Sequence, residues 1–263
     1  MKTCIVIPTF NNSLLTLQCL DSLLKYTSDS VSIIIIDDHS TDEEFAKLMN
    51  GLPPIDGFRR IDVCRSSANV GFANICNEGS QLVRTDVIIF LNNDTLVTEH
   101  WYSKLISKIN INRICGSKLL YPENKYSTIH NKQIQKGTIQ HVGIIVDDKN
   151  LPQHIYRFER DDLPEANIYK TYPYITGAVL AIYKEVFEDL GGFNNKYING
   201  CEDLDLCLRS RKKGIEIIYC PESVAFHHET ATRNPEITNL ALFMQEYKHE
   251  LEKDRYFESK ELT

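Results

Sequence analysis

Short β-branched runs alternate with longer amphipathic stretches over the first 120 residues, and this alternation constrains the fold more than any other feature. Strands that alternate with helices form a parallel sheet with helices packed on its faces. The sequence therefore predicts an α/β fold with a Rossmann-like, mostly parallel central sheet. The expected strands are Cys4–Ile7, Ser32–Asp37, Arg60–Cys64 and Val87–Leu91, and the expected helices are Leu14–Leu24, Glu43–Leu52 behind a Ser40-x-x-Glu43 capping box, and Phe72–Leu82.

The second half of the chain is less regular. Residues 125–173 read as a loop-rich insertion with one strand, and the tail shows apolar residues at helical spacing from Ile237 to Leu251. This tail predicts a helix that docks on the domain, with a membrane surface or a second subunit as the alternative contact. We divide the chain into a domain of residues 1–232, with halves 1–120 and 121–232, and a helical tail, 233–263. The expected elements of the second half are strands His141–Val146, Ile175–Ile182 and Glu216–Tyr219 and helices Lys184–Leu190 and Glu202–Lys213.

Composition excludes several classes of protein. The formal net charge of −7, without a cluster of basic residues, argues against nucleic acid as a partner. The longest aliphatic runs fall far below the roughly 20 residues that a membrane-spanning helix needs. The eight cysteines show no paired C-x-x-C spacing and are typical of small core side chains in a reducing compartment. We therefore expect a cytoplasmic protein, with peripheral contact at the inner face of the membrane as an open alternative.

Polar residues gather directly after all four predicted strands of the first half. Because the carboxyl ends of parallel strands share one edge of a sheet, these residues describe a ligand crevice. The alternative is that strands simply end in polar turns, which explains one such group more readily than four. The groups are Pro8 to Asn11, Asp37-Asp38, Arg65 to Asn69 and Asn92-Asn93-Asp94.

Three groups of side chains could carry chemistry. Asp94 ends a buried strand, where a carboxylate could bind a hard divalent cation, or form only an Asx turn. Glu202 and Asp203 begin a helix whose dipole favours ionised carboxylates, whereas Asp205 is expected to pair with Arg209 four residues on. His227 follows a strand-like segment and is either a metal ligand or an ordinary imidazole.

An ordered set of motifs covering roughly residues 3–232 resembles the family 2 glycosyltransferases, above all the bacterial members that build O-antigen, capsule and other surface polysaccharides, including rhamnosyltransferases. Each motif is weak alone, but their order and spacing are specific. The motifs are Ile5 to Asn11, Ile36 to Asp42, Asn69-Val70-Gly71-Phe72, Leu91 to Thr95, Thr176-Gly177-Ala178, Gly191-Gly192-Phe193, Glu202 to Leu206 and His227-His228-Glu229.

The resemblance implies a GT-A fold, a UDP- or dTDP-linked sugar donor, a divalent metal (Mn²⁺ or Mg²⁺), and transfer with inversion to a glycan or lipid-linked glycan. Residues 1–120 would then bind the nucleotide sugar, and residues 121–232 would hold the acceptor and the catalytic base. By position, the implied roles are catalytic base for Asp203; metal ligands for Asp94 and His227; donor or nucleotide contacts for Pro8, Thr9, Asp38, Asn69, Gly71 and Asn93; and acceptor or sugar positioning for Thr176, Gly177 and Glu202.

One departure from the family pattern concerns the metal. The D-x-D element reads Asn92-Asn93-Asp94, with a single carboxylate, so we expect weak metal binding unless the donor diphosphate adds oxygen ligands. A catalytically inactive sugar-nucleotide-binding subunit is the main alternative function. A nucleotidyltransferase is disfavoured because no glycine-rich loop follows the first strand, and a nicotinamide dehydrogenase because G-x-G-x-x-G is missing.

Overall fold

The computed structural model describes residues 1–28, 30–53, 60–127, 130–228 and 237–262, so Glu229 of the last motif lies outside the described residues. The elements in chain order are β1 (Thr3–Thr9), α1 (Ser13–Tyr26), β2 (Ser32–Asp37), α2 (Asp42–Gly51), β3 (Ile61–Arg65), α3 (Phe72–Leu82), β4 (Val87–Leu91), β5 (Thr95–Val97), α4 (Trp101–Ile106), β6 (Arg113–Leu120), β7 (Lys125–Ser127), β8 (Lys132–Ile134), β9 (Ile139–His141), β10 (Ile144–Val146), β11 (Pro152–His154), a 3₁₀ turn η1 (Pro164–Ala166), β12 (Lys170–Thr171), β13 (Val179–Tyr183), α5 (Lys184–Asp189), α6 (Glu202–Lys212), β14 (Glu216–His227), α7 (Ile237–Glu246) and α8 (Lys248–Asp254).

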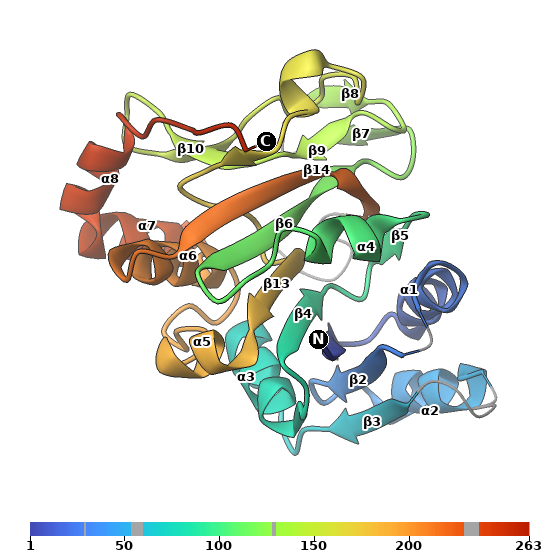
Figure 1. Cartoon of the computed structure of the whole chain (residues 1–263). Helices are drawn as coiled ribbons and strands as arrows, with labels where there is room; N and C mark the ends of the chain where they lie inside the picture. The colour runs from blue at the N-terminus through green and yellow to red at the C-terminus, as the bar shows by residue number, and fades with distance from the viewer. Residues whose placement is uncertain (29, 54–59, 128–129, 229–236, 263) are drawn as a thin grey trace.

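A single mixed sheet runs through the molecule in the order β12-β14-β6-β13-β4-β1-β2-β3 (Figure 1). Strands β3, β2, β1 and β4 are parallel, as the alternation of strands and helices predicts. Beyond them, β13 pairs antiparallel with β4 and β6, and β14 runs parallel to β6. Two short strands join the sheet from the side, β5 on β14 and β9 on β6. The predicted α/β fold is confirmed, with antiparallel strands added in its second half.

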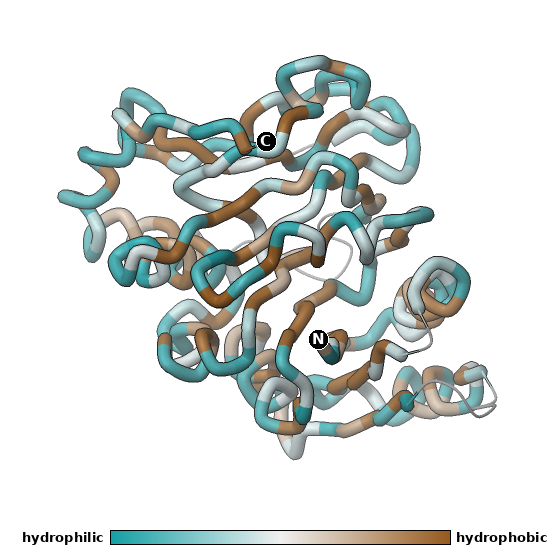
Figure 2. Tube along the Cα trace, in the orientation of Figure 1, coloured by the Kyte–Doolittle hydropathy of each residue, from teal (hydrophilic) through white to brown (hydrophobic). Residues whose placement is uncertain are grey.

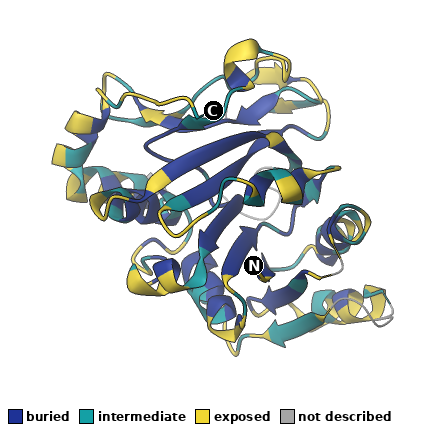
Figure 3. Ribbon diagram, in the orientation of Figure 1, coloured by how far each residue is buried: buried dark blue, intermediate teal, exposed yellow. Residues whose placement is uncertain are grey.

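Alternate residues of the central strands face two separate cores. In β1, Val6 packs with α3, α5 and α6 on one face, while Ile5 and Ile7 pack with α1, α2 and α4 on the other. This follows from the two-residue period of a strand, which explains why strands buried on both faces read as continuous apolar runs. The apolar segments and the buried residues accordingly coincide along the central strands (Figures 2 and 3).

Several predicted boundaries shift. The capping box is wrong by one residue: Thr41 caps α2 by accepting the Glu44 N–H (3.3 Å), because Ser40 is bound to Asp37. The strand expected at 141–146 is two strands, β9 and β10, separated by Val142 and Gly143. β13 begins at Val179 rather than at residue 175. β14 continues to residue 227 through an irregularity between residues 220 and 224.

The C-terminal helices dock on the domain, which is the first of the two alternatives for the tail. Phe243 and Leu251 are fully buried in the core that contains α6. No helix of the described residues is both long and apolar enough to cross a membrane.

Candidate active site

The predicted metal ligands are brought together by the backbone register of two strands. Asp94 immediately precedes β5, and β5 pairs antiparallel with the end of β14 so that Thr95 lies opposite His227 (Figure 1). The Asp94 carbonyl also accepts the N–H of His228 (3.0 Å). Two residues far apart in the sequence are thereby fixed as neighbours by main-chain pairing.

The Asp94 carboxylate faces the His227 imidazole in a buried setting. Its Oδ1 lies 3.2 Å from His227 Nε2, and the Asp94 residue is only 4% exposed. Burial by itself would raise the pKa of Asp94, but the positive charge of a protonated His227 ring outweighs burial, so the pKa of Asp94 lies below its usual value. Asp94 is therefore ionised, and its Oδ1 accepts no hydrogen bond from any residue that the structure describes.

Gln140, on β9, sets the tautomer of His227. Its Nε2 donates to the His227 carbonyl (3.0 Å), which can only accept, so its Oε1 must face His227 Nδ1 (2.7 Å). Nδ1 therefore carries a proton and donates it to Oε1. In the neutral ring, Nε2 then presents a lone pair toward Asp94, which is the arrangement that an imidazole metal ligand requires.

The donor atoms fit a divalent cation. Carboxylate oxygen suits Mg²⁺ and Mn²⁺, while imidazole nitrogen favours first-row transition metals, so the Asp94–His227 pair suits Mn²⁺ better than Mg²⁺. Asn92 adds an Oδ1 that is buried and accepts no hydrogen bond within the described ranges. No cluster of three His, Cys, Asp or Glu residues exists among the described residues. A bound cation would consequently need ligands beyond those that Asp94, His227 and Asn92 supply.

Asp203, the predicted catalytic base, lies at the first turn of α6 beside the same edge of the sheet. Its Oδ2 accepts the Gly177 N–H (2.9 Å) and its Oδ1 accepts the N–H of Leu204 (2.8 Å). Burial raises the Asp203 pKa despite these hydrogen bonds and one from the Thr176 side chain. This carboxylate is held in one orientation and has a stronger affinity for a proton than an exposed aspartate.

A short backbone link connects Asp203 to the Asp94–His227 pair. The Asn92 N–H donates to the Ala178 carbonyl (2.9 Å), one residue from the Gly177 N–H that binds Asp203. The Asn92 side chain in turn lies 3.3 Å from His227 Nε2. All three predicted catalytic and metal-binding side chains thus gather at the carboxyl end of β4.

Three of the predicted nucleotide-binding residues, Asp38, Asn69 and Gly71, are joined by hydrogen bonds that hold the loop before α3. The Asp38 carboxylate accepts the N–H groups of Val70 (2.7 Å) and Gly71 (3.0 Å), and the Asn69 side chain donates to the Asp38 carbonyl (3.1 Å). Gly71 has φ +82°, and a Cβ there would lie 2.3 Å from Ile198 Cγ2. Only glycine fits this contact, which joins the loop before α3 to the loop before α6.

Thr9 and Asn93 are buried and tied to α1. The Asn93 amide donates to the hydroxyls of Thr9 (3.2 Å) and Thr16 (3.0 Å), which also bond to each other (2.8 Å). Pro8 lies beside Ile36 in the β1–β2 register. These contacts fix the ends of β1 and β4 relative to each other.

Glu202 and Asp205 have partners in or just before α6. The Glu202 residue is buried and its carboxylate accepts the N–H of Gly200 two residues earlier. Asp205 pairs with Arg209, as predicted from their spacing, with 2.6 Å between the charged atoms.

The sequence reasoning missed two residues of this site. Gln140 orients His227, and His141 accepts the Thr176 N–H through Nε2 (3.3 Å). Both residues belong to the irregular insertion, where no local pattern marks these roles. Asp37, which the sequence placed at the edge of the expected crevice, accepts the Ser40 N–H (3.1 Å).

Comparison with known proteins supports the same assignment. The family model described as glycosyl transferase family 2 matches residues 4–191, and one described as the N-terminal domain of galactosyltransferase matches residues 161–233. The chain is 27% identical to the O-antigen biosynthesis protein RfbC of Myxococcus xanthus over 88% of its own length but 18% of that protein. It is 26% identical to the O-antigen chain rhamnosyltransferase RfbN of Salmonella typhimurium over 90% of its own length and 69% of that protein.

Two solved structures share the fold. GalNAc-T7, crystallised with UDP, GalNAc and Mn²⁺, superposes with a TM-score of 0.69 at 20% identity, covering 97% of this chain and 50% of that one. The mannosyltransferase PcManGT from Pyrobaculum calidifontis, in complex with GDP-Man and Mn²⁺, gives a TM-score of 0.60 at 14% identity, covering 94% and 61%. The chain spans a quarter or less of two of the curated relatives it matches.

Proposed function

The chain belongs to glycosyltransferase family 2, and from this we propose that it transfers a sugar from a UDP- or dTDP-linked donor to a hydroxyl of a growing cell-surface glycan, with inversion and with a divalent metal. The names of its relatives RfbC and RfbN, both tied to O-antigen, support the choice of acceptor. Residues 1–120 would bind the donor, and residues 121–232 would hold the acceptor.

The observation that carries the proposal is the convergence of Asp94, His227 and Asp203 at one edge of the sheet. The first two present a buried carboxylate oxygen and an imidazole nitrogen 3.2 Å apart. Asp203 is joined to them through the backbone of residues 177, 178 and 92. An inverting transfer needs one base for the acceptor and one anchoring point for the leaving diphosphate, and these three side chains supply both.

Asp94 and His227 would anchor the donor through a cation. When bound, a divalent cation neutralises charge on the departing diphosphate. Asp94 contributes an ionised carboxylate, and Gln140 keeps the Nε2 lone pair of His227 directed to the same place. With so few protein ligands, the diphosphate oxygens would complete the coordination.

Asp203 would remove the proton from the acceptor hydroxyl. Its raised pKa makes it a better base than an exposed aspartate, and the N–H groups of Gly177 and Leu204 hold its two oxygens in place. A group within hydrogen-bonding reach of the hydroxyl suffices, because inversion needs no covalent enzyme intermediate.

The Asp38 loop would form the nucleotide end of the site. Asp38 forms hydrogen bonds with Asn69 and Gly71, and Pro8 and Thr9 lie at the end of the adjacent strand. We propose that a pyrimidine base binds against these residues, with Asp38 and the end of β1 as its walls.

The first test is the Asp203→Asn variant. We expect it to fold normally and to bind the UDP- or dTDP-sugar found in a thermal-shift screen with Mn²⁺, but to lose about 10²–10⁴-fold in transfer rate, since the amide cannot take a proton. Release of nucleoside diphosphate from the donor reports turnover.

The Glu188→Gln variant serves as its control, since the Glu188 side chain is exposed on α5, at the opposite edge of the sheet. Near-wild-type turnover by Asp203→Asn would overturn the assignment of the base. A wild-type chain that binds the donor but never releases nucleoside diphosphate, with any acceptor, would be a binding subunit instead.

A further inference from the structure

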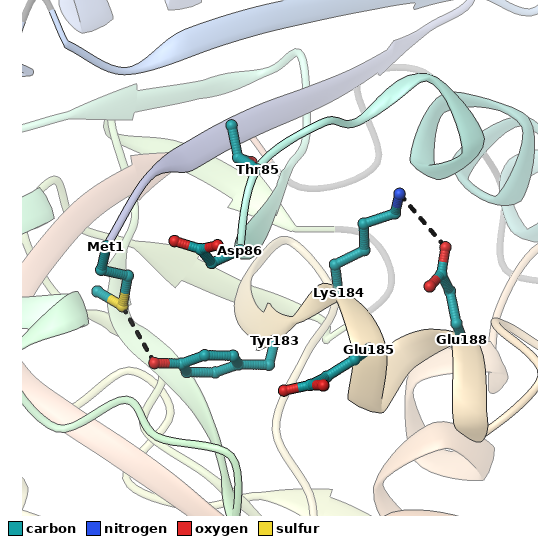
Figure 4. A pocket seen from close by; sticks show the side chains of 7 residues that line it. All are labelled: Met1, Thr85, Asp86, Tyr183, Lys184, Glu185 and Glu188. Atoms are coloured by element: carbon teal, nitrogen blue, oxygen red, sulfur yellow. Dashed lines mark hydrogen bonds and ion pairs between the residues drawn. The ribbon is translucent and has the colours of Figure 1, made fainter.

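A hollow of about 460 Å³ lies in the insertion, beside the candidate active site but outside the set of residues that the sequence singled out. Its wall includes His130, His154, Tyr156, Arg157 and Phe158. The volume lies within the range of about 300–1,000 Å³ typical of small-molecule sites. A second hollow, of about 410 Å³, lies at the opposite edge of the sheet around Lys184, whose ion pair with Glu188 spans 3.4 Å (Figure 4). No contact joins that second hollow to Asp94, Asp203 or His227 within the described part of the chain.

Two aromatic residues in the wall of the first hollow have strained backbones. Tyr156 has φ +54° and Phe158 has φ +73°, a region that costs a bulky side chain about 1–3 kcal/mol. Hydrogen bonds hold the strained segment to β9: the Phe158 N–H donates to the Ile139 carbonyl (2.7 Å), and the Ile139 N–H donates to the Glu159 carbonyl (2.8 Å). The Phe158 ring also stacks on Tyr121, with 5.7 Å between centroids. The Phe158 ring is thus fixed in the wall by Tyr121, with the Lys132 ammonium 4.6 Å from its centroid, and Tyr156 lines the hollow beside it.

A chain of hydrogen bonds runs from this hollow to the loop that binds Asp203. Because the Thr176 N–H donates to His141 Nε2 (3.3 Å), His141 carries its proton on Nδ1. That proton is donated to His154 Nδ1 (2.9 Å), so His154 carries its own proton on Nε2. Burial lowers the pKa of both rings, to about 3 for His141, which keeps them neutral. Within the described ranges nothing accepts from His154 Nε2, and it is left as a donor in the wall of the hollow.

A second chain of contacts links the hollow to the metal-binding pair. Arg157 donates through Nε to the Gln140 carbonyl (3.2 Å) and lies 2.9 Å from His130 through Nη1. Gln140 is the residue that holds His227. The hollow is therefore fixed in position relative to both the proposed base and the proposed metal ligands.

We propose that this hollow is a subsite for the acceptor glycan. The subsite binds the sugar unit next to the one whose hydroxyl receives the transferred sugar. The inference rests on the proposed function. Rigid aromatic rings pack against the apolar faces of sugar rings, while planar polar groups such as the Arg157 guanidinium and His154 Nε2–H bind their hydroxyls. The loop of Thr176 and Gly177 binds Asp203 and is joined to the wall of the hollow through His141 and His154. In this proposal the next sugar unit of the acceptor extends from the hollow toward Asp203.

The test uses the full chain with UDP and Mn²⁺, a printed array of bacterial surface oligosaccharides, and saturation-transfer NMR on the glycans that bind. In His154→Asn the amide oxygen can replace Nδ1 as the acceptor for His141, while the donor facing the hollow is lost. We expect this variant and Tyr156→Ala each to weaken glycan binding about tenfold. The affinity for UDP and Mn²⁺ should stay within twofold of the wild type, and Glu188→Gln, in the other hollow, should bind glycans normally.

Either of two results would overturn the subsite: no glycan of the array binds although UDP and Mn²⁺ do, or glycans bind equally well to the wild type and to both variants. Measuring Tyr156→Ala beside His154→Asn keeps the test decisive if one variant folds poorly. Failure of the wild type to bind any nucleotide would be a different result, because it would overturn the proposed function.

Discussion

The two nitrogens of the His227 ring have different partners, and this asymmetry decides what the residue can do. Nδ1 is committed to Gln140, whose orientation is fixed by its own bond to the His227 carbonyl. Nε2 is left facing Asp94. Gln140, in the irregular insertion, therefore controls the chemistry of the last residue of β14, which lies far from it in the sequence.

Replacing Gln140 by alanine should weaken metal binding. Without Oε1 the ring loses its fixed tautomer and orientation, and such outer partners of a metal ligand are typically worth 10–100-fold in affinity. We expect the apparent Kd for Mn²⁺, measured in the presence of UDP by electron paramagnetic resonance of the free ion, to rise by about that factor. The exposed Gln133→Ala serves as the control, and an unchanged Kd in Gln140→Ala would show that His227 needs no support.

The buried pair His141–His154 should make stability depend on pH. The pKa of His141 falls from 6.5 to about 3 because of burial, then the Arg157 and His227 charges. Between these values the unfolded chain binds a proton that the folded chain does not, so stability is complete above pH 6.5 and falls as the pH falls toward 3. His154 acts in the same direction.

Urea unfolding at pH 7 and pH 5 measures this effect. We expect the wild type to lose about 2 kcal/mol more on acidification than His141→Gln, in which an amide oxygen can still accept the Thr176 N–H. Equal losses in the two proteins would mean that His141 is protonated in the folded state.

At the scale of elements, the loop before α3 and the loop before α6 meet at one glycine. Gly71 lies against Ile198, and the same loop is held from the other side by Asp38. The Phe72 N–H adds a bond to the side chain of Asn199 (3.3 Å). The loop of Asn69 to Gly71, proposed to bind the nucleotide, and the loop before α6, which leads to the proposed catalytic base Asp203, are therefore joined as one unit.

Gly71→Ala should disrupt the contact between the loops before α3 and α6 and lower the free energy of unfolding. The positive φ costs about 1–2 kcal/mol for a residue with a Cβ, and the contact of 2.3 Å with Ile198 Cγ2 adds about 1–3 kcal/mol of overpacking. Gly137→Ala is the matched control, because Gly137 has φ +81° but nothing within 4 Å of its Cβ position. Its free energy of unfolding should therefore fall only by the about 1–2 kcal/mol that the positive φ costs. Urea unfolding measures both, and the double variant Gly71→Ala/Ile198→Ala should recover part of the loss. Equal losses at positions 71 and 137 would remove the steric argument.

At the scale of the whole molecule, the C-terminal helices are locked to α6 by charge as well as by apolar packing. Arg211 donates to Asp254 (2.9 Å), and the Tyr174 hydroxyl donates to the same carboxylate. Tyr247 donates to Asp205 (2.7 Å), which already pairs with Arg209. These contacts with the C-terminal helices thus hold α6, the helix that carries Asp203, in place.

Asp254→Asn should loosen this attachment. Breaking a mostly buried ion pair leaves Arg211 without its counter-charge and should lower the free energy of unfolding by about 3 kcal/mol. Glu250→Gln removes a more exposed pair with Lys212 between the same two helices and should cost less than about 1 kcal/mol. Denaturant titration compares them, and similar losses would show that apolar packing alone holds the tail.

The sequence predicted the first half of the fold well because its signals are local. β2, β4 and α3 have the predicted bounds, because continuous apolar runs mark the two strands directly and Gly71 precedes the helix. β14 was predicted to end at Tyr219, whereas the strand continues to His227 through an irregularity between residues 220 and 224. Thr176 to Ala178 were predicted as strand because they lie in an apolar run, but they form the loop that binds Asp203. Gln140 could not be found, since its role depends on contacts between distant segments.

The pairing of β5 with the end of β14 has a consequence during synthesis. Asp94 leaves the ribosome on the order of ten seconds before His227, at a translation rate of about 5–20 residues per second. Until the last long strand of the sheet has settled beside β6, the nascent chain possesses a carboxylate but no imidazole next to it. If Asp94 and His227 hold the cation as proposed, the ion can bind only after the sheet is complete, and a half-synthesised chain would not hold it at this place.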